Sequence, residues 1–404
     1  MKVELEYCGK KVPVECADDK VLDVIHPADL GMPEVDIGSE ITGPAREFLK
    51  GKGDNIVFII NDHTRPTPND SVIAPLLPLL EGKDVTFILA LGSHPAPDDA
   101  GLANVFGDVF GKVKDRIVLH DCRGDLVDLG TTSRGTPVKI NRMAAEADAI
   151  ITINALESHY FAGFSGGRKS ILPGVSSYET IEANHKLALQ DGSFDTALSG
   201  NPVHEDMTEA AGLLDKPVFS IQLVFDGAHR VISVEYGDLF RSFDRAVPLA
   251  RKVACAKIKE AADIVVAVAP NPKDVNFYQA QQALEKGKLA LRDGGIIILV
   301  AECAKGVGND KFYKLLSSSS DPDEVLDMIS REYKLGYHKA ARIADLAKKA
   351  KIFLVSKMEP EVAENCFMTP YTDPQKALDD ALAIDPSGRV TFLLDGFLTV
   401  PTLA

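Results

Sequence analysis

Three histidines occupy positions that suit proton transfer or metal binding. His94 and His159 each follow a predicted buried strand, whereas His185 lies in the helical pattern YETIEANHKLALQ. The carboxyl ends of neighbouring parallel strands meet at one edge of a sheet, so we expect His94 and His159 to face one crevice. Two imidazoles on one pocket suit a reaction that moves protons on both faces of a carbon atom. A hydrogen-bonded structural histidine is the alternative at each position.

A glycine-rich segment, GFSGGRKSILPG at 163–174, carries Arg168, Lys169 and Ser170. Glycines let backbone N–H groups approach a ligand closely, and the basic pair suits a phosphate or a carboxylate. The segment comes close to a P-loop, but Arg168 stands where that motif has glycine, which disfavours nucleotide hydrolysis. A glycine-rich turn with solvent-facing charges is the other interpretation that stays open.

Asp62 and Arg65 lie in a proline-rich turn, DHTRPTP. The prolines restrict the backbone, and the planar guanidinium of Arg65 suits a bidentate contact with a carboxylate or phosphate. Asp62 could accept a hydrogen bond from a ribose hydroxyl, as acidic residues do in dinucleotide sites. An Asp62–Arg65 ion pair that only stabilises the turn is equally consistent with the sequence.

Short apolar runs that alternate with helical patterns must position these residues. Such runs are typical of parallel sheets covered on both faces, so the sequence predicts an α/β fold with two domains, each with a mainly parallel sheet flanked by helices. We assign 1–250 to an N-terminal catalytic and cofactor-binding domain, and 251–404 to a C-terminal Rossmann-like α/β domain that closes over an active site in the interdomain cleft. The runs are 54–61, 84–92, 147–154, 261–270, 294–301 and 351–356.

The composition disfavours nucleic acid and membranes as partners. The chain has 404 residues, of which 45% are hydrophobic and 25% charged, with a formal net charge of −15. Such a charge repels nucleic acids and anionic lipid surfaces, and no apolar run reaches the ~18 residues of a membrane span. The six cysteines are scattered and the start lacks a signal-peptide pattern, so we expect a cytoplasmic protein with reduced thiols.

Taken together, DHTRPTP, GSH and SHYFAGFSGGRKSILPGVSS followed by ANH resemble the signature of the lactate racemase family, which uses a nickel pincer nucleotide. The resemblance implies that Lys169 attaches this cofactor covalently through a thioamide and that His185 ligates the nickel. It also implies that His94 and His159 are the acid/base pair, helped by Arg65. The residues that it implies around the cofactor are Asp62, Arg65, Arg168, Ser170, Tyr278 and Gln279.

The resemblance further implies a racemase or epimerase of a 2-hydroxy acid. One histidine takes the hydroxyl proton while the α-hydride moves to the cofactor, and a 2-keto acid forms transiently. Hydride then returns to either face. The implied partners are the small 2-hydroxy acid and, transiently, the proteins that make the cofactor.

Two departures from the lactate-acting members leave the substrate open. Pro95 follows His94 where those members have arginine, and Gln282, a predicted substrate contact, stands where they have lysine. The chain also has no tryptophan for an aromatic wall. Lactate or another 2-hydroxy acid is therefore expected. The alternatives are a non-catalytic carrier or sensor of the nickel nucleotide, which would not need paired histidines, and a phosphate-binding transferase, which Arg168 disfavours.

Overall fold

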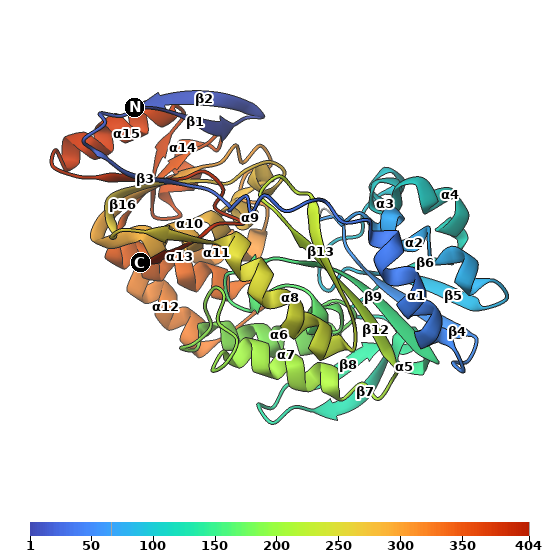
Figure 1. Cartoon of the computed structure of the whole chain (residues 1–404). Coiled ribbons are helices and arrows are strands. Elements are labelled where there is room, and N and C mark those ends of the chain that lie inside the picture. The colour runs from blue at the N-terminus through green and yellow to red at the C-terminus, as the bar shows by residue number, and fades with distance from the viewer. Residues whose placement is uncertain (66, 404) are drawn as a thin grey trace. The chain divides into compact units, whose positions relative to one another are not determined.

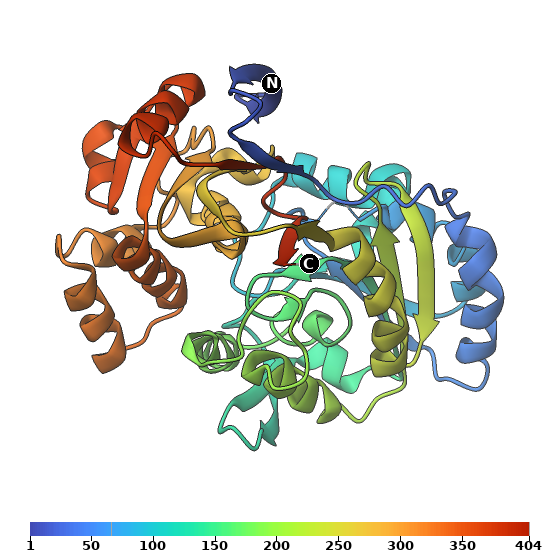
Figure 2. The ribbon, with the colours of Figure 1, turned by 60° about the vertical axis from the view of Figure 1, so that its left-hand side comes forward.

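The computed structural model describes residues 1–65 and 67–403, which form two compact units. The central unit is Asp29–Lys252, and the terminal unit combines Met1–Ala28 with Val253–Ala404. The assignment of 1–28 to the N-terminal domain is therefore wrong. Residues 21–25 form β3 (Val21–Ile25), which pairs in parallel with β19 (Val390–Leu393) near the other end of the chain. Figure 2 shows the blue β3 reaching the red strands of the terminal unit.

The central unit is built on a six-stranded sheet in the order β13-β12-β9-β4-β5-β6 (Figure 1). All neighbours are parallel except β12 and β13. The apolar runs predicted from the sequence are β4, β5 and β9, so the α/β prediction is confirmed here. The strands are β4 (Asn55–Asn61), β5 (Asp84–Ala90), β6 (Ile117–Leu119), β9 (Ala149–Leu156), β12 (Val218–Phe225) and β13 (Val231–Gly237).

One face of this sheet packs against helices in an apolar core. Phe58, Phe87 and Ile151 from three strands contribute to it together with Ile41 of α1 (Ile37–Leu49). The other face lies under a short 3-10 helix, η4 (Gly167–Ser170). The remaining helices of the unit are α2 (Asn69–Ile73), α3 (Asp99–Phe106), α4 (Phe110–Val113), α5 (Arg142–Glu146), α6 (Tyr178–Lys186), α7 (Pro202–Gly212) and α8 (Leu239–Ala254). Short strands are β7 (Leu126–Thr131), β8 (Pro137–Asn141), β10 (Ser158–His159) and β11 (Gly163–Phe164).

The terminal unit has a six-stranded parallel sheet in the order β18-β17-β16-β15-β19-β3. Consecutive residues of β15, such as Val265 and Val266, point to opposite faces of the sheet and enter different apolar cores, as expected for a sheet covered on both sides. Its other strands are β15 (Ala262–Val268), β16 (Leu291–Val300), β17 (Lys351–Val355), β18 (Met368–Tyr371), β14 (Cys255–Ile258) and β20 (Val400–Leu403). Its helices are α9 (Phe277–Ala280), α10 (Gln282–Gly287), α11 (Asp310–Leu316), α12 (Pro322–Arg331), α13 (Tyr337–Lys349), α14 (Pro360–Glu364) and α15 (Pro374–Ile384).

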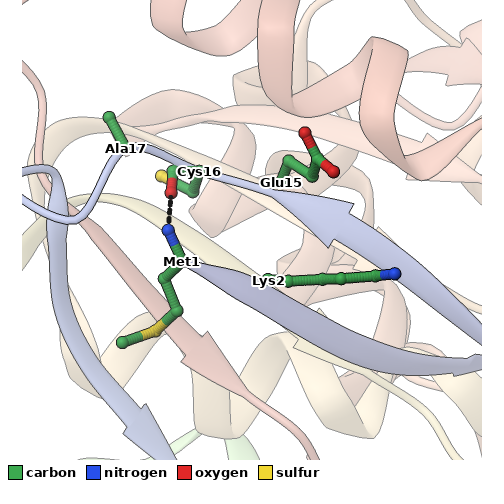
Figure 3. Close-up of a pocket in the computed structure, with 5 residues that line it drawn as sticks. All are labelled: Met1, Lys2, Glu15, Cys16 and Ala17. Atoms are coloured by element: carbon green, nitrogen blue, oxygen red, sulfur yellow. Dashed lines mark hydrogen bonds between the residues drawn. The ribbon is translucent and has the colours of Figure 1, made fainter.

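An N-terminal hairpin of β1 (Lys2–Tyr7) and β2 (Lys10–Glu15) adds Val3 and Leu5 to one of these cores. A hollow of about 470 Å³ lies beside it, lined by Met1, Lys2, Glu15, Cys16 and Ala17 (Figure 3). The Met1 amine donates a hydrogen bond to the Cys16 carbonyl at 2.5 Å across this hollow. None of the predicted site residues lines it. Within residues 1–65 and 67–403, no helix has both the length and the apolar character that a bilayer crossing requires.

Candidate active site

Asp62 and His94 form the first pair of the site. Asp62 directly follows β4, and His94 follows the adjacent parallel strand β5, so the two strand ends bring the side chains together. Asp62 Oδ2 lies 2.6 Å from His94 Nδ1. The other oxygen of Asp62 accepts hydrogen bonds from the backbone N–H and the hydroxyl of Thr64, at 3.1 and 2.6 Å. Sequence reasoning placed both residues in the site but missed their contact.

The surroundings of Asp62 keep its carboxyl ionised. Burial alone would raise its pKa, but the hydrogen bond and charge of His94, the Thr64 hydroxyl and the charge of Arg65 outweigh this and hold the pKa well below its usual range. An ionised carboxylate only accepts hydrogen bonds, so Nδ1 of His94 must carry the proton. The His94 side chain is 48% exposed, and its Nε2 atom is therefore the nitrogen that can take a substrate proton.

Arg65 pairs with Glu157 rather than with Asp62. Arg65 Nη1 lies 2.8 Å from Glu157 Oε2, and the two side chains are 26% and 10% exposed. The interpretation of Asp62 and Arg65 as a pair that only stabilises the turn is therefore wrong, since each has a different partner. Glu157 is a site residue that sequence reasoning missed, although it directly follows β9 and precedes Ser158-His159, a strand end already predicted to carry chemistry.

His159 is held in a different setting from His94. It lies in β10, which pairs with β11, and its Nδ1 accepts a hydrogen bond from the Ala162 backbone N–H at 3.3 Å. Its ring stacks on Tyr160 and meets Phe161 edge-on at 4.6 Å between centroids. Burial, and the charges that Lys169, Arg65, His185 and Arg168 carry when protonated, hold the pKa of His159 well below its ordinary value. Its imidazole is therefore neutral at neutral pH.

Lys169 presents an amine that is suited to covalent attachment. Burial and the positive charges of Arg65 and Arg168 hold the pKa of Lys169 well below its ordinary value, against an opposing effect of Asp62. Within the described part of the chain its Nζ makes no hydrogen bond or ion pair, and it lies 5.8 Å from the centre of the Phe161 ring. A neutral amine is the nucleophilic form of lysine.

Arg168 and Ser170, on either side of Lys169, have partners within the protein. Arg168 is 1% exposed, donates to the carbonyls of Ala162 and Gly166 at 2.7 and 3.2 Å, and lies 4.4 Å from the centre of the Phe243 ring. Burial lowers the pKa of Arg168 to about 9. The Ser170 hydroxyl donates to Asn154 Oδ1 at 2.5 Å. Both side chains stabilise the loop, and their predicted contact with a cofactor stays a prediction.

The glycines of this loop approach the protein itself. A Cβ atom on Gly166 would lie 2.7 Å from Gln222 Oε1, and one on Gly167 would lie 3.0 Å from the Phe243 side chain. The segment also matches G-x-S-x-G, a motif of serine hydrolases. Its Ser165 hydroxyl is buried and donates to the Ala155 carbonyl at 2.8 Å, so it is not placed as an exposed nucleophile.

Phe161 connects the three predicted functional groups of this side of the site. Its ring contacts His159, lies below the Lys169 amine and meets the His185 ring at 5.2 Å between centroids. His185 is carried by α6, which begins at the Ser177 cap and is tied through Asn184 Nδ2 to Asp206 at 2.8 Å. The sequence showed Phe161 only as part of SHYFAGF. Among the residues that the structure describes, no group of three or more His, Cys, Asp and Glu side chains is arranged to hold a metal ion.

Tyr278, Gln279 and Gln282 lie together at a helical corner of the terminal unit. Asn276 caps α9 by accepting from the Gln279 N–H at 2.9 Å, and Gln282 Nε2 donates to Gln279 Oε1 at 3.4 Å. Lys339 fixes this corner, because its amine donates to the Tyr278 carbonyl at 2.8 Å and lies 3.7 Å from the centre of the Tyr278 ring. Burial and the charge of Lys273 lower the pKa of Lys339 to about 7. That this corner closes over the site stays a prediction.

Comparison with known proteins matches two segments of the chain to models of one family. Residues 12–196 match the model of the lactate racemase N-terminal domain, and residues 257–400 match that of the C-terminal domain. Lactate racemase of Thermoanaerobacterium thermosaccharolyticum is 30% identical, with 98% of this chain and 97% of that protein covered. Lactate racemase of Lactiplantibacillus plantarum is 33% identical, with 87% and 85% covered.

A solved structure supports the same relationship. The lactate racemase apoprotein from Thermoanaerobacterium thermosaccharolyticum superposes with a TM-score of 0.90 at 28% identity, over 100% of both chains. These relatives identify the chain as an α/β enzyme of the racemase class of isomerases. The chain belongs to the lactate racemase family.

Proposed function

We propose that this enzyme racemises or epimerises a 2-hydroxy acid with the help of a nickel pincer nucleotide attached to Lys169. The observation that carries the proposal is the convergence of two imidazoles, Arg65 and a neutral lysine amine on one edge of the central sheet. Lactate is the first substrate to test because the relatives are named lactate racemases. Pro95 and Gln282 leave other 2-hydroxy acids open. We also propose that it works in the cytoplasm, after accessory proteins have made the cofactor.

The residues present fit this cofactor. The Lys169 amine has the neutral form that thioamide formation requires, and His185 offers an imidazole, which is a good nickel ligand. Phe161 contacts both side chains and so keeps them on one apolar surface. When bound, the cofactor supplies a reversible acceptor for the α-hydride of the substrate.

His94 and His159 then each serve one enantiomer. Nε2 of His94 accepts the hydroxyl proton of one substrate enantiomer, and the ionised Asp62 stabilises the resulting imidazolium. His159, which starts neutral, accepts the hydroxyl proton of the other. For inversion, hydride adds to the other face of the 2-keto acid, and the opposite histidine, protonated by exchange with water, donates a proton to the new hydroxyl group. The first histidine releases its proton to water, which restores the starting state.

Arg65 is proposed to bind the substrate carboxylate. Glu157 engages its Nη1 atom, so this ion pair fixes the plane of the guanidinium while the remaining N–H groups can bind the ligand. The negative charge of Glu157 beside Arg65 also weakens nonspecific anion binding. Tyr278, Gln279 and Gln282 are proposed to contact the cofactor and substrate and to exclude water when the terminal unit closes.

The test begins with protein purified from cells that make the cofactor. Nickel content and intact mass should show one nickel and one nucleotide per chain, and Lys169→Ala should lack the added mass. Chiral chromatography should then show each enantiomer of lactate, or of a longer 2-hydroxy acid, converting to the other. The proposal fails if Lys169→Ala still carries the nucleotide covalently, or if loaded enzyme inverts none of a broad set of 2-hydroxy acids.

A further inference from the structure

The two central strands below the Lys169 loop have one apolar face and a second face with a polar middle. Ile151 and Ile153 of β9 enter the apolar core with Ile221 of β12. The middle of the opposite face is polar, although each of its four residues is at most 1% exposed: Thr152, Asn154, Ser220 and Gln222. Apolar residues flank them on that face: Ile150, Leu156 and Val224. Strands of a buried parallel sheet are usually apolar on both faces. The polar middle of this face therefore needs a separate explanation.

These four residues, the strand network, are hydrogen-bonded to one another. The register places Thr152 opposite Ser220 and Asn154 opposite Gln222. The Thr152 and Ser220 hydroxyls lie 2.7 Å apart, Asn154 Nδ2 donates to Thr152 Oγ1 at 3.0 Å, and Gln222 Nε2 donates to Ser220 Oγ at 2.7 Å. Buried amides and hydroxyls are tolerated when they are bonded in this way.

Two hydrogen bonds connect the strand network to the loop, one on each side of Lys169. Gln222 Oε1 accepts from the Gly167 N–H at 3.1 Å, and Asn154 Oδ1 accepts from the Ser170 hydroxyl at 2.5 Å. The loop can sit this close because Gly166 has no Cβ atom to meet Gln222. Both amide side chains thus have their acceptor oxygen directed at the loop and their donor directed at the strands.

Burying amides and hydroxyls costs free energy that apolar side chains at these positions would avoid. The strand network therefore calls for a role other than filling space. We propose that the strand network positions Lys169, with Gln222 and Asn154 as the positioning residues. Gln222 holds the Gly167 backbone before Lys169, and Asn154 holds the Ser170 side chain after it. Before Lys169 in the chain, Arg168 donates hydrogen bonds to the carbonyls of Ala162 and Gly166. Directly after Lys169, the Ser170 hydroxyl donates to Asn154. The inference deepens the proposed function and rests on it for the role of Lys169.

Three variants test this inference in the full-length protein. Asn154→Leu removes both the acceptor for Ser170 and the donor to Thr152. Thr152→Val is milder, since it only removes a hydroxyl from the strand network. Thr391→Val is the matched control, because Thr391 is likewise a fully buried threonine of a central parallel strand, and within the described residues its hydroxyl has no hydrogen-bond partner.

The first measurement is made on protein without cofactor. Competitive labelling with acetic anhydride at several pH values, read by mass spectrometry of the Lys169 peptide, reports how the amine titrates. Loosening the loop exposes the amine to water, so the midpoint for Asn154→Leu should rise by about one pH unit or more. Thr152→Val should shift it in the same direction by less, and Thr391→Val should leave it unchanged at a similar melting temperature.

The second measurement is the fraction of chains that carry the nucleotide in cells that make it. Asn154→Leu should reduce this fraction about tenfold, because a displaced amine no longer meets the nucleotide in the position that bond formation needs. Wild-type titration and wild-type loading in both network variants would overturn the inference. If Asn154→Leu does not fold, the inference is judged by whether Thr152→Val shifts the labelling midpoint and the loaded fraction relative to its control Thr391→Val. If even the wild-type protein never acquires a nucleotide, the proposed function fails, and the labelling midpoints alone judge the strand network.

Discussion

His94 and His159 follow strands of the same sheet, but the protein holds their imidazoles by different means. His94 is about half exposed and is bonded through Nδ1 to the ionised Asp62 at 2.6 Å. His159 is packed among aromatic rings and positive charges, and its Nδ1 accepts only a backbone N–H at 3.3 Å. One histidine has a built-in counter-charge and the other has none among the contacts described above.

The two histidines therefore differ in how the protein can stabilise their protonated forms. Asp62 places a carboxylate against Nδ1 of His94 before any substrate is present. The charges of Arg65 and Arg168 act on His159, so a protonated His159 is unfavourable until negative charge enters the site. A substrate carboxylate on Arg65 would supply that charge. We therefore expect the His159 side to depend on bound substrate more strongly than the His94 side.

Removing either imidazole should give the largest effect. His94→Gln and His159→Gln should each lower the rate of racemisation about 10³-fold, because each full turnover needs a base on both sides. The two variants should fail on opposite enantiomers when keto-acid formation from each pure enantiomer is followed in a single turnover. Loss of the same enantiomer in both variants would show that the histidines do not divide the work in this way.

Asp62→Asn should break the His94 side alone. The carboxamide can no longer stabilise an imidazolium and favours the wrong tautomer of His94, so keto-acid formation in a single turnover should slow about 10²-fold for the enantiomer that His94 serves. Single-turnover formation of the keto acid from each pure enantiomer measures this. Equal losses for both enantiomers would place Asp62 outside the His94 side.

The same pair should leave a signature in stability. The native pKa of Asp62 is lowered, so its ionisation contributes stability above the ordinary aspartate pKa of about 3.9, and this contribution is lost as the pH falls through the lower native value. Asp62→Asn should therefore cost about 1–3 kcal/mol of unfolding free energy at neutral pH and progressively less in acid. Urea titrations of both proteins across this range check the sign. A cost that grows in acid would contradict the ionised state of Asp62.

Glu157→Gln should have the smallest effect. The amide keeps a hydrogen bond to Arg65 but loses the charge that fixes it, so KM should rise about three- to tenfold with little change in kcat. Steady-state kinetics with each enantiomer separates the two constants. A large fall in kcat with unchanged KM would instead assign Glu157 to proton transfer.

The sequence was sufficient for the elements whose signal is local. Continuous Val and Ile runs predicted β4, β5 and β9, because strands buried on both sides have little choice of residue, and the strand ends then predicted where His94 and His159 would lie. The pairing of β3 with β19 was not predictable in this way, since a partner more than three hundred residues away leaves no local pattern.

Within the site, residue types were easier to predict than contacts. Asp62 and Arg65 were singled out, yet a single sequence does not show that one pairs with His94 and the other with Glu157. The glycines of the loop suggested a close ligand, whereas at Gly166 and Gly167 the close neighbours are Gln222 and Phe243. The polar residues Thr152 and Asn154 within an apolar run were a visible signal of the strand network.

The most direct test of the account is the fate of a deuterium at the α-carbon. Loaded enzyme is given one pure enantiomer of 2-deuterolactate, or of a longer 2-hydroxy acid that it inverts, in ordinary water, and the product enantiomer is isolated and weighed by mass spectrometry. Hydride transfer from and to the same carbon predicts that the inverted product keeps its deuterium. Loss of the deuterium to solvent at the rate of inversion would mean that a base removes the α-hydrogen as a proton, and would contradict the account.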